Sequence, residues 1–162
     1  MEKKLIIEII GIAVATIVAV GIAIYQVNSS KQKIIDKRKT ASHQNIWNAL
    51  NKMRVYFDMG MQKELQSIGT LKLEPIFEFR NVVNESKTNI DIELYRELVK
   101  FYENISTRTN AHLFTPMKLY LNDKSKLSQS ELMNIELQVN SSREKITTDI
   151  ELFMKEKRQE LK

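Results

Sequence analysis

The sequence predicts an all-α protein with a single N-terminal transmembrane helix, a helical stalk and a small bundle of about four helices. Residues 5–25 carry a single charge, Glu8, and residues 22–59 contain neither glycine nor proline. Several later segments place apolar residues at helical spacing. We therefore expect an N-terminal tail over 1–4, a transmembrane anchor over 5–25, a basic juxtamembrane stalk over 26–41 and a helical bundle domain over 42–162.

The apolar segment over residues 5–25 is long enough to cross a bilayer as a helix. At ~1.5 Å per residue it spans roughly 31 Å, close to the thickness of the hydrocarbon core. Its twelve Leu, Ile and Val residues outweigh the cost of Glu8, about 3 kcal/mol, which lies near the end and reaches the headgroups. A functional intramembrane acid is the alternative reading of Glu8. A cleaved signal peptide ending near Ala23 is the alternative for the whole segment, but the apolar run is longer than a usual signal.

Basic residues follow the predicted anchor and account for most of the net charge. The whole chain has a net charge of +5, and residues 31–39 contribute five positive charges and one negative charge. From residue 40 onward, eighteen Lys and Arg face seventeen Asp and Glu. This pattern predicts a bilayer with anionic headgroups as a partner, and it excludes nucleic acid, which needs a basic face on the domain itself. The membrane-flanking basic residues are Lys31, Lys33, Lys37, Arg38 and Lys39.

The same charges bear on localisation. The sequence predicts a single-pass protein of the cell membrane, and the positive-inside rule favours a cytoplasmic domain after the anchor. Many short-tailed anchors keep the N-terminus inside instead, so the opposite orientation stays open. The chain has no cysteine that would indicate a compartment.

The first helix of the bundle is predicted from a continuous apolar stripe. Ser42 is a candidate N-cap for this helix, and Gly69 is the residue type that ends one. Steps of three and four separate its apolar residues, which predicts one buried face. These residues are Ile46, Leu50, Met53, Phe57, Met61, Leu65 and Ile68.

Residues 71–79 can be read as a strand or as a helix. Leu71, Leu73 and Phe77 alternate as in a strand, but Pro75 cannot donate to a central ladder. Pro75 suits the first turn of a short helix instead. That helix would turn three residues inward: Ile76, Phe79 and Val83.

Two more helices follow in the second half of the chain. Asp91 is predicted to cap a helix with an apolar face at Leu94, Leu98, Phe101 and Ile105. Residues 107–123, which include Pro116, are predicted to be a loop, and one helical turn around Leu119 stays open. Ser128 and Glu131 form the sequence signature of a capping box. The last helix then carries apolar residues at helical spacing: Leu132, Ile135, Val139, Ile146, Ile150, Phe153 and Leu161.

The residues that usually carry chemistry are scarce. The chain has two histidines, His43 and His112, and no cysteine. Neither histidine has the spacing of a zinc site, and no glycine lies in a phosphate-binding loop. The sequence therefore predicts a protein that is not an enzyme, with no cofactor and no metal.

Aromatic residues are the candidates for contact with a partner. Trp47, Tyr56 and Phe114 could anchor a protein partner, because aromatic residues dominate binding hot spots. Packing into the core is the alternative for Trp47, which flanks the apolar stripe. Ile34 and Ile35, inside the basic segment, suit a helix lying on headgroups or a contact between copies, so an oligomer stays open.

In size, N-terminal anchor over 5–25, basic flank over 31–39 and helical remainder, the chain resembles small prophage-encoded, membrane-anchored superinfection-exclusion proteins. The resemblance implies a non-enzymatic interaction protein that blocks DNA entry at the host membrane by binding an unidentified membrane protein. A single-span holin-type lysis protein is one alternative. A membrane-tethered regulatory or scaffold protein of a low-GC bacterium is the other.

Overall fold

The computed structural model describes residues 2–60, 73–118 and 126–161, with side-chain surroundings given from residue 14 onward. Across these ranges the chain is helical and contains no strand, which confirms the all-helical prediction. Contacts divide the chain into two compact units, Met1–Lys39 and Thr40–Lys162.

The first helix, α1 (Glu2–Val55), continues without a break through the predicted start of the bundle. Ser42 was expected to begin a new helix there, and that expectation is wrong, because Ser42 lies buried inside α1. No glycine or proline interrupts the sequence at this point, so nothing in the backbone forces a new start. A π-helix, η1 (Tyr56–Gly60), follows α1 directly. The predicted end of this helix at Gly69 lies outside the described residues, as do Met61, Leu65 and Ile68 of its predicted stripe.

The transmembrane part of the predicted fold class is corrected by the structure. Among the residues that the structure describes, no helix is both long and apolar enough to cross a bilayer, so the prediction of a span over 5–25 is wrong for them. The described side chains begin at Val14, and from there apolar residues predominate up to Val27, after which polar residues follow. Those fourteen residues span about 21 Å as a helix, short of the ~30 Å hydrocarbon core. The side chains of residues 1–13, on which the prediction also depended, lie outside the described residues.

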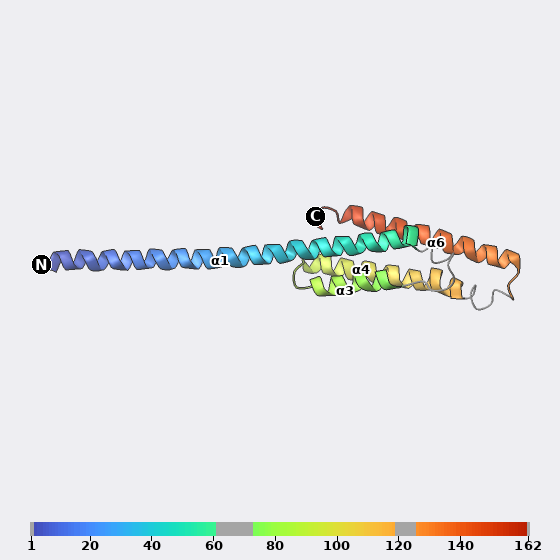
Figure 1. Ribbon diagram of the computed structural model, residues 1–162, viewed down its shortest axis with the longest axis horizontal. Coiled ribbons are helices and arrows are strands. Elements are labelled where there is room, and N and C mark those ends of the chain that lie inside the picture. Colours follow the sequence, from blue (N-terminus) through green and yellow to red (C-terminus); the bar gives the residue numbers. More distant parts are fainter. Residues whose placement is uncertain (1, 61–72, 119–125, 162) are drawn as a thin grey trace. The chain divides into compact units, whose positions relative to one another are not determined.

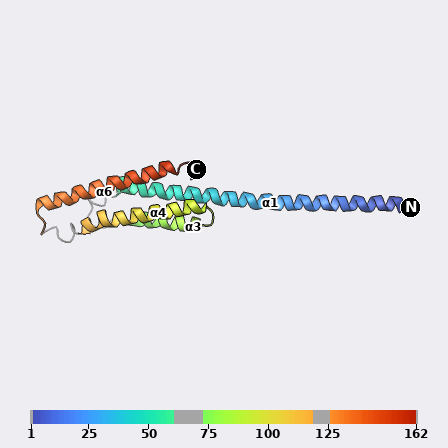
Figure 2. The same cartoon turned by 180° about the vertical axis from the view of Figure 1, so that it is seen from behind.

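The unit Thr40–Lys162 packs the C-terminal part of α1 with three further helices. These are α3 (Glu74–Ser86), α4 (Ile92–Thr109) and α6 (Gln129–Glu156), and a second π-helix, η2 (Asn110–Phe114), extends α4. Figures 1 and 2 show the four helical segments of this unit side by side, with chain direction reversing at each connection. This is the up-down-up-down order of a helix bundle.

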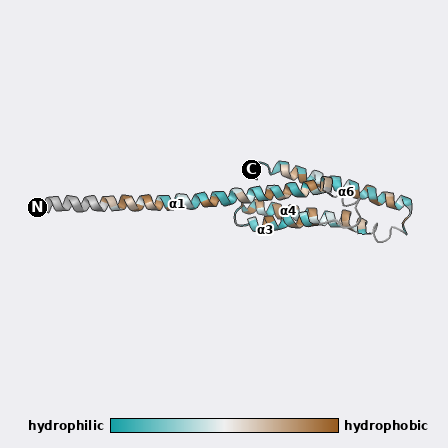
Figure 3. Ribbon diagram, viewed as in Figure 1, coloured by the Kyte–Doolittle hydropathy of each residue, from teal (hydrophilic) through white to brown (hydrophobic). Residues whose placement is uncertain are grey.

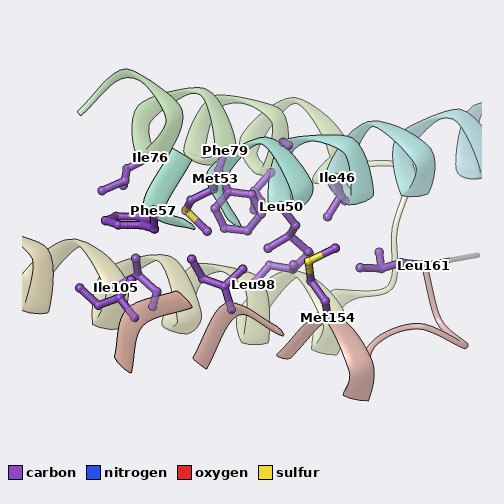
Figure 4. Packing of buried hydrophobic residues seen from close by; sticks show 14 of the residues in the cluster. Ile46, Leu50, Met53, Phe57, Ile76, Phe79, Leu98, Ile105, Met154 and Leu161 are labelled. Carbon is purple, nitrogen blue, oxygen red and sulfur yellow. The ribbon is translucent and has the colours of Figure 1, made fainter. Parts of the chain in front are cut away.

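The core of the bundle collects apolar side chains from every one of its helices. Ile46, Leu50, Met53 and Phe57 of the predicted stripe are all 0 % exposed. Figure 4 shows them in one cluster with Phe79 of α3 and Leu98 of α4. Phe101 of α4 stacks on Phe153 of α6 with ring centroids 3.9 Å apart. Apart from Leu132, the described residues of the predicted apolar stripes therefore belong to a single core.

Local sequence signals account for where α3 and α4 begin. Pro75 lies in the first turn of α3, where a missing N–H costs nothing, and Ile76, Phe79 and Val83 are buried as the helical reading predicts. The described part of 71–79 is therefore helical from Glu74. The Asp91 carboxylate accepts a hydrogen bond from the backbone N–H of Glu93 at 2.8 Å, which confirms it as the cap of α4.

The loop predicted over 107–123 is wrong for its described residues. The chain stays helical through η2 and on to Lys118, and residues 119–123 lie outside the described residues. Leu113, Pro116 and Met117 are buried, so packing favours helix over loop here. Pro116 has no N–H to donate to the preceding turn. The π-helix η2, whose turns are wider than those of an α-helix, ends just before Pro116. The Thr115 hydroxyl donates a hydrogen bond to the Asn110 carbonyl at 3.1 Å.

The last helix begins as predicted and ends earlier. Ser128 and Glu131 form the capping box: the Ser128 N–H donates to the Glu131 carboxylate at 2.8 Å, and the Glu131 N–H donates to the Ser128 hydroxyl at 3.3 Å. The helix stops at Glu156, and a turn over 157–160 returns Leu161 to the core, where it is 1 % exposed. Leu161 therefore packs from a turn and not from the helix.

Candidate functional site

The most unusual surface lies on the part of α1 within the unit Met1–Lys39. Over residues 14–27, every large apolar side chain is more than half exposed, up to 72 % for Ile17 and 74 % for Tyr25. Figure 3 shows hydrophobic colour along this stretch and hydrophilic colour on the helix after it. The exposed residues are Val14, Ile17, Val18, Val20, Ile22, Ile24, Tyr25 and Val27.

These side chains do not form a narrow stripe. Each residue of an α-helix advances about 100°, so the eight positions cover about 220° of the circumference. Small and polar residues fill the remaining side: Ala15, Thr16, Ala19, Ala23 and Gln26. A helix that is apolar over most of its surface is normally covered by another apolar phase.

The predicted basic residues follow directly on the same helix. Lys31, Lys33, Lys37, Arg38 and Lys39 are all exposed. Ile34 and Ile35 lie among them and are 51 % and 57 % exposed. Gln32 donates to the Asp36 carboxylate at 3.0 Å, one helical turn on. Apolar side chains and cations thus share one exposed surface over residues 31–39.

The predicted aromatic contacts lie in the other unit and on separate elements. Trp47 of α1 and Tyr56 of η1 are half-buried and pack against the core, and Tyr56 also meets Phe57 edge-on at 5.5 Å. Phe114 is half-buried in η2. Each is therefore only partly accessible to solvent, so these three residues do not offer a broad aromatic surface.

The structure also shows hollows that the sequence did not reveal. One of about 140 Å³ lies between α3 and α4. Arg80 stacks over the Tyr102 ring there, 5.7 Å from its centroid, and Tyr95 donates to the Asn84 side chain at 3.3 Å. A larger hollow of about 250 Å³ lies between α4, η2 and α6 and includes His112. Its residues belong to helices far apart in sequence, so only the packing register brings them together.

The described residues include no group of three or more His, Cys, Asp or Glu that could hold a metal ion. His112 is exposed, on η2 rather than on a loop. Comparison of the chain with protein-family models, with curated proteins and with solved structures finds no match. The function is therefore inferred from the chain's own residues.

Proposed function

We propose that this chain is a non-enzymatic interaction protein of the cell membrane, which associates with anionic bilayers through residues 14–39 and binds a protein partner through its helical bundle. The exposed apolar run over 14–27, followed by the exposed cations over 31–39, is the observation that carries the proposal.

Burial of the apolar run supplies the driving force. Full burial of a large apolar side chain stabilises the associated state by about 1.5–3 kcal/mol. Burial of the eight exposed residues therefore strongly favours association. Contiguous exposed apolar surface on this scale marks a site of protein or membrane interaction. Helices with mixed apolar and basic surfaces associate with the interface of anionic bilayers.

The basic segment supplies the lipid preference. Each Lys or Arg close to an anionic surface adds roughly 1 kcal/mol at physiological ionic strength. The five cations of residues 31–39 therefore favour anionic over neutral lipid, while Asp36 opposes them with one negative charge. The remaining chain is nearly neutral, so the preference comes from this segment.

Flotation with lipid vesicles tests the proposal. Full-length protein should float with vesicles of phosphatidylcholine and phosphatidylglycerol, and less with phosphatidylcholine alone. Replacing the five cations of residues 31–39 by Gln should abolish the difference between the two lipids. A matched variant replaces five exposed cations of the bundle by Gln and should keep it: Arg96, Lys100, Lys118, Lys155 and Arg158.

Three outcomes contradict the proposal. Protein that stays out of both vesicle fractions contradicts association with lipid. Equal loss of the preference for anionic lipid in the two Gln variants would show that overall charge, and not residues 31–39, sets this preference. Association of the protein with itself, and not with vesicles, would indicate that a second copy of the chain buries the apolar residues 14–27.

Phage exclusion is the most specific form of this proposal. In this form, the folded helical bundle binds the partner and blocks DNA entry. Leu98 is 0 % exposed in the core, so Leu98→Asp should unfold the bundle and abolish resistance of cells to phage DNA entry. A holin-type protein acts through its N-terminal helix instead, and the same variant should still lyse cells. Leu152→Asp, at a leucine that is 59 % exposed, is the matched control and should behave as the wild type.

A further inference from the structure

The hollow of about 250 Å³ between α4, η2 and α6 is lined mainly by hydrogen-bond donors. The volume is below the ~300–1,000 Å³ of sites for drug-sized ligands, so it suits a small group. Six of the described residues line it: Arg108, His112, Ser141, Ser142, Lys145 and Ile146.

Antiparallel packing of α4 and α6 brings these residues together. Phe101 stacks on Phe153, and further along α4 the Arg108 guanidinium pairs with the Asp149 carboxylate. The next turn of the chain after Arg108 carries His112. The facing turn of α6 carries Lys145, and the lining serines lie three and four residues before it, on the same helical face.

The ion pair with Asp149 holds the Arg108 guanidinium at the edge of the hollow. The Arg108 guanidinium bonds to Asp149 through Nη1. A guanidinium has five N–H donors, so other donors of Arg108 are left for a ligand. Asp149 is on the same helix as Lys145 but does not line the hollow. Ile146 is 1 % exposed and gives the hollow an apolar wall.

Within the described ranges, the side chains of His112, Ser142 and Lys145 form no hydrogen bond or ion pair. The described residues of the lining include two cations, Arg108 and Lys145, and no carboxylate. The acid next to Lys145 in sequence, Glu144, points its carboxylate to Arg143 at 3.9 Å.

We infer that this hollow binds a phosphate group. A tetrahedral oxyanion accepts hydrogen bonds from several directions, and the donors here come from two helices. Lys145 and the N–H donors that Arg108 does not use for Asp149 favour an oxyanion, and Arg, Lys and Ser are common phosphate ligands. A carboxylate would be satisfied by Arg108 alone and would leave Lys145 and the serine hydroxyls unused. The site is independent of the lipid-binding segment over residues 14–39.

Titration of full-length protein with inorganic phosphate tests the inference, followed by amide NMR shifts and compared with sodium chloride at the same ionic strength. Phosphate should shift the amides of residues 108–114 and 141–146 selectively. Lys145→Gln should weaken phosphate binding about tenfold or more, since it removes one of the two cations among the described lining residues. Lys155→Gln, at an exposed lysine on the same helix outside the hollow, is the matched control and should bind as the wild type.

Lipid and soluble sources of the phosphate are distinguished with vesicles containing phosphatidic acid. Weaker vesicle binding by Lys145→Gln than by Lys155→Gln identifies a lipid headgroup, whereas equal vesicle binding identifies a soluble phosphate. Absence of selective shifts in the folded wild type would overturn the inference. Equal weakening of phosphate binding by Lys145→Gln and Lys155→Gln would overturn the inference as well, because the effect would then come from overall charge and not from the hollow.

Discussion

Arg143 of α6 donates from a buried guanidinium to the backbone carbonyl of Phe57, with Nη1 3.1 Å from the oxygen. The same nitrogen lies 2.7 Å from the carbonyl of Asp58. Carbonyls near the C-terminal end of a helix lack some of their intrahelical donors and carry the negative end of its dipole. A cation from a neighbouring helix therefore satisfies them and ties α6 to η1.

Removing this cation should destabilise the bundle. We expect Arg143→Met to lower the free energy of unfolding by about 2 kcal/mol, because the buried Phe57 carbonyl and the part-buried Asp58 carbonyl lose a charged donor. Urea unfolding followed by far-UV circular dichroism measures it. Arg158→Met, at an exposed arginine after α6, should change stability by less than about 0.5 kcal/mol. Equal stabilities of the two variants would contradict the role assigned to Arg143.

Lys157 should make the bundle sensitive to alkaline pH. Its side chain is 7 % exposed and pairs with the carboxylates of Glu97, Glu156 and Glu160. The hydrogen bond to Glu97 chiefly raises the pKa of Lys157 above its ordinary value of 10.5, against the opposing effect of burial. A group whose pKa is higher in the folded state stabilises fully below the unfolded pKa and loses that contribution as the pH rises through the folded value.

The stability difference between wild type and Lys157→Met should therefore be constant at neutral pH and shrink as the pH rises above 10.5. At neutral pH we expect the difference to be about 1–2 kcal/mol, because the carboxylate partners are half exposed. Urea unfolding across this pH range measures it, with Lys155→Met as the exposed control. A difference that grows with alkaline pH would have the wrong sign for this account.

The capping box should give α6 a dependence on acidic pH. Hydrogen bonds from the Ser128 side chain and backbone lower the pKa of the Glu131 carboxyl below its ordinary value of 4.5. A lowered carboxyl pKa stabilises above the unfolded value and loses its contribution as the pH falls through the folded value. Ser128→Ala should lower the free energy of unfolding by about 1 kcal/mol at neutral pH and by less at acidic pH. Gln129→Ala should change the free energy of unfolding little. A cost for Ser128→Ala that does not fall under acid would contradict this coupling.

Much of the fold follows from local sequence signals. The apolar residues of α3, α4 and α6 are spaced for a helix, and Asp91 and Ser128 cap the helices that they were expected to cap. The loop predicted around Pro116 failed because burial of Leu113 and Met117 outweighs the local signals for a turn. The predicted span over 5–25 depended partly on residues whose side chains are not described.

The candidate sites were predicted less completely. The cations over 31–39 are visible in the sequence and exposed in the structure. The buried roles of Arg143 and Lys157 could not be read from the sequence, because a charged residue on a helix is usually on the surface. The phosphate site needs the register of α4 against α6. Its one sequence signal is the spacing of the two serines and Lys145, which many solvated helices share.

Association of residues 14–27 with lipid is the central claim, and a fluorescent label tests it most directly. The chain has no cysteine, so Ile24→Cys gives a single site for an NBD probe within the apolar run, and Leu152→Cys gives a matched site at an exposed residue of the bundle. On addition of vesicles that contain phosphatidylglycerol, NBD at position 24 should brighten and shift to shorter wavelength, while NBD at position 152 should keep its emission in water. Water-like emission at position 24 in the presence of these vesicles would contradict the claim.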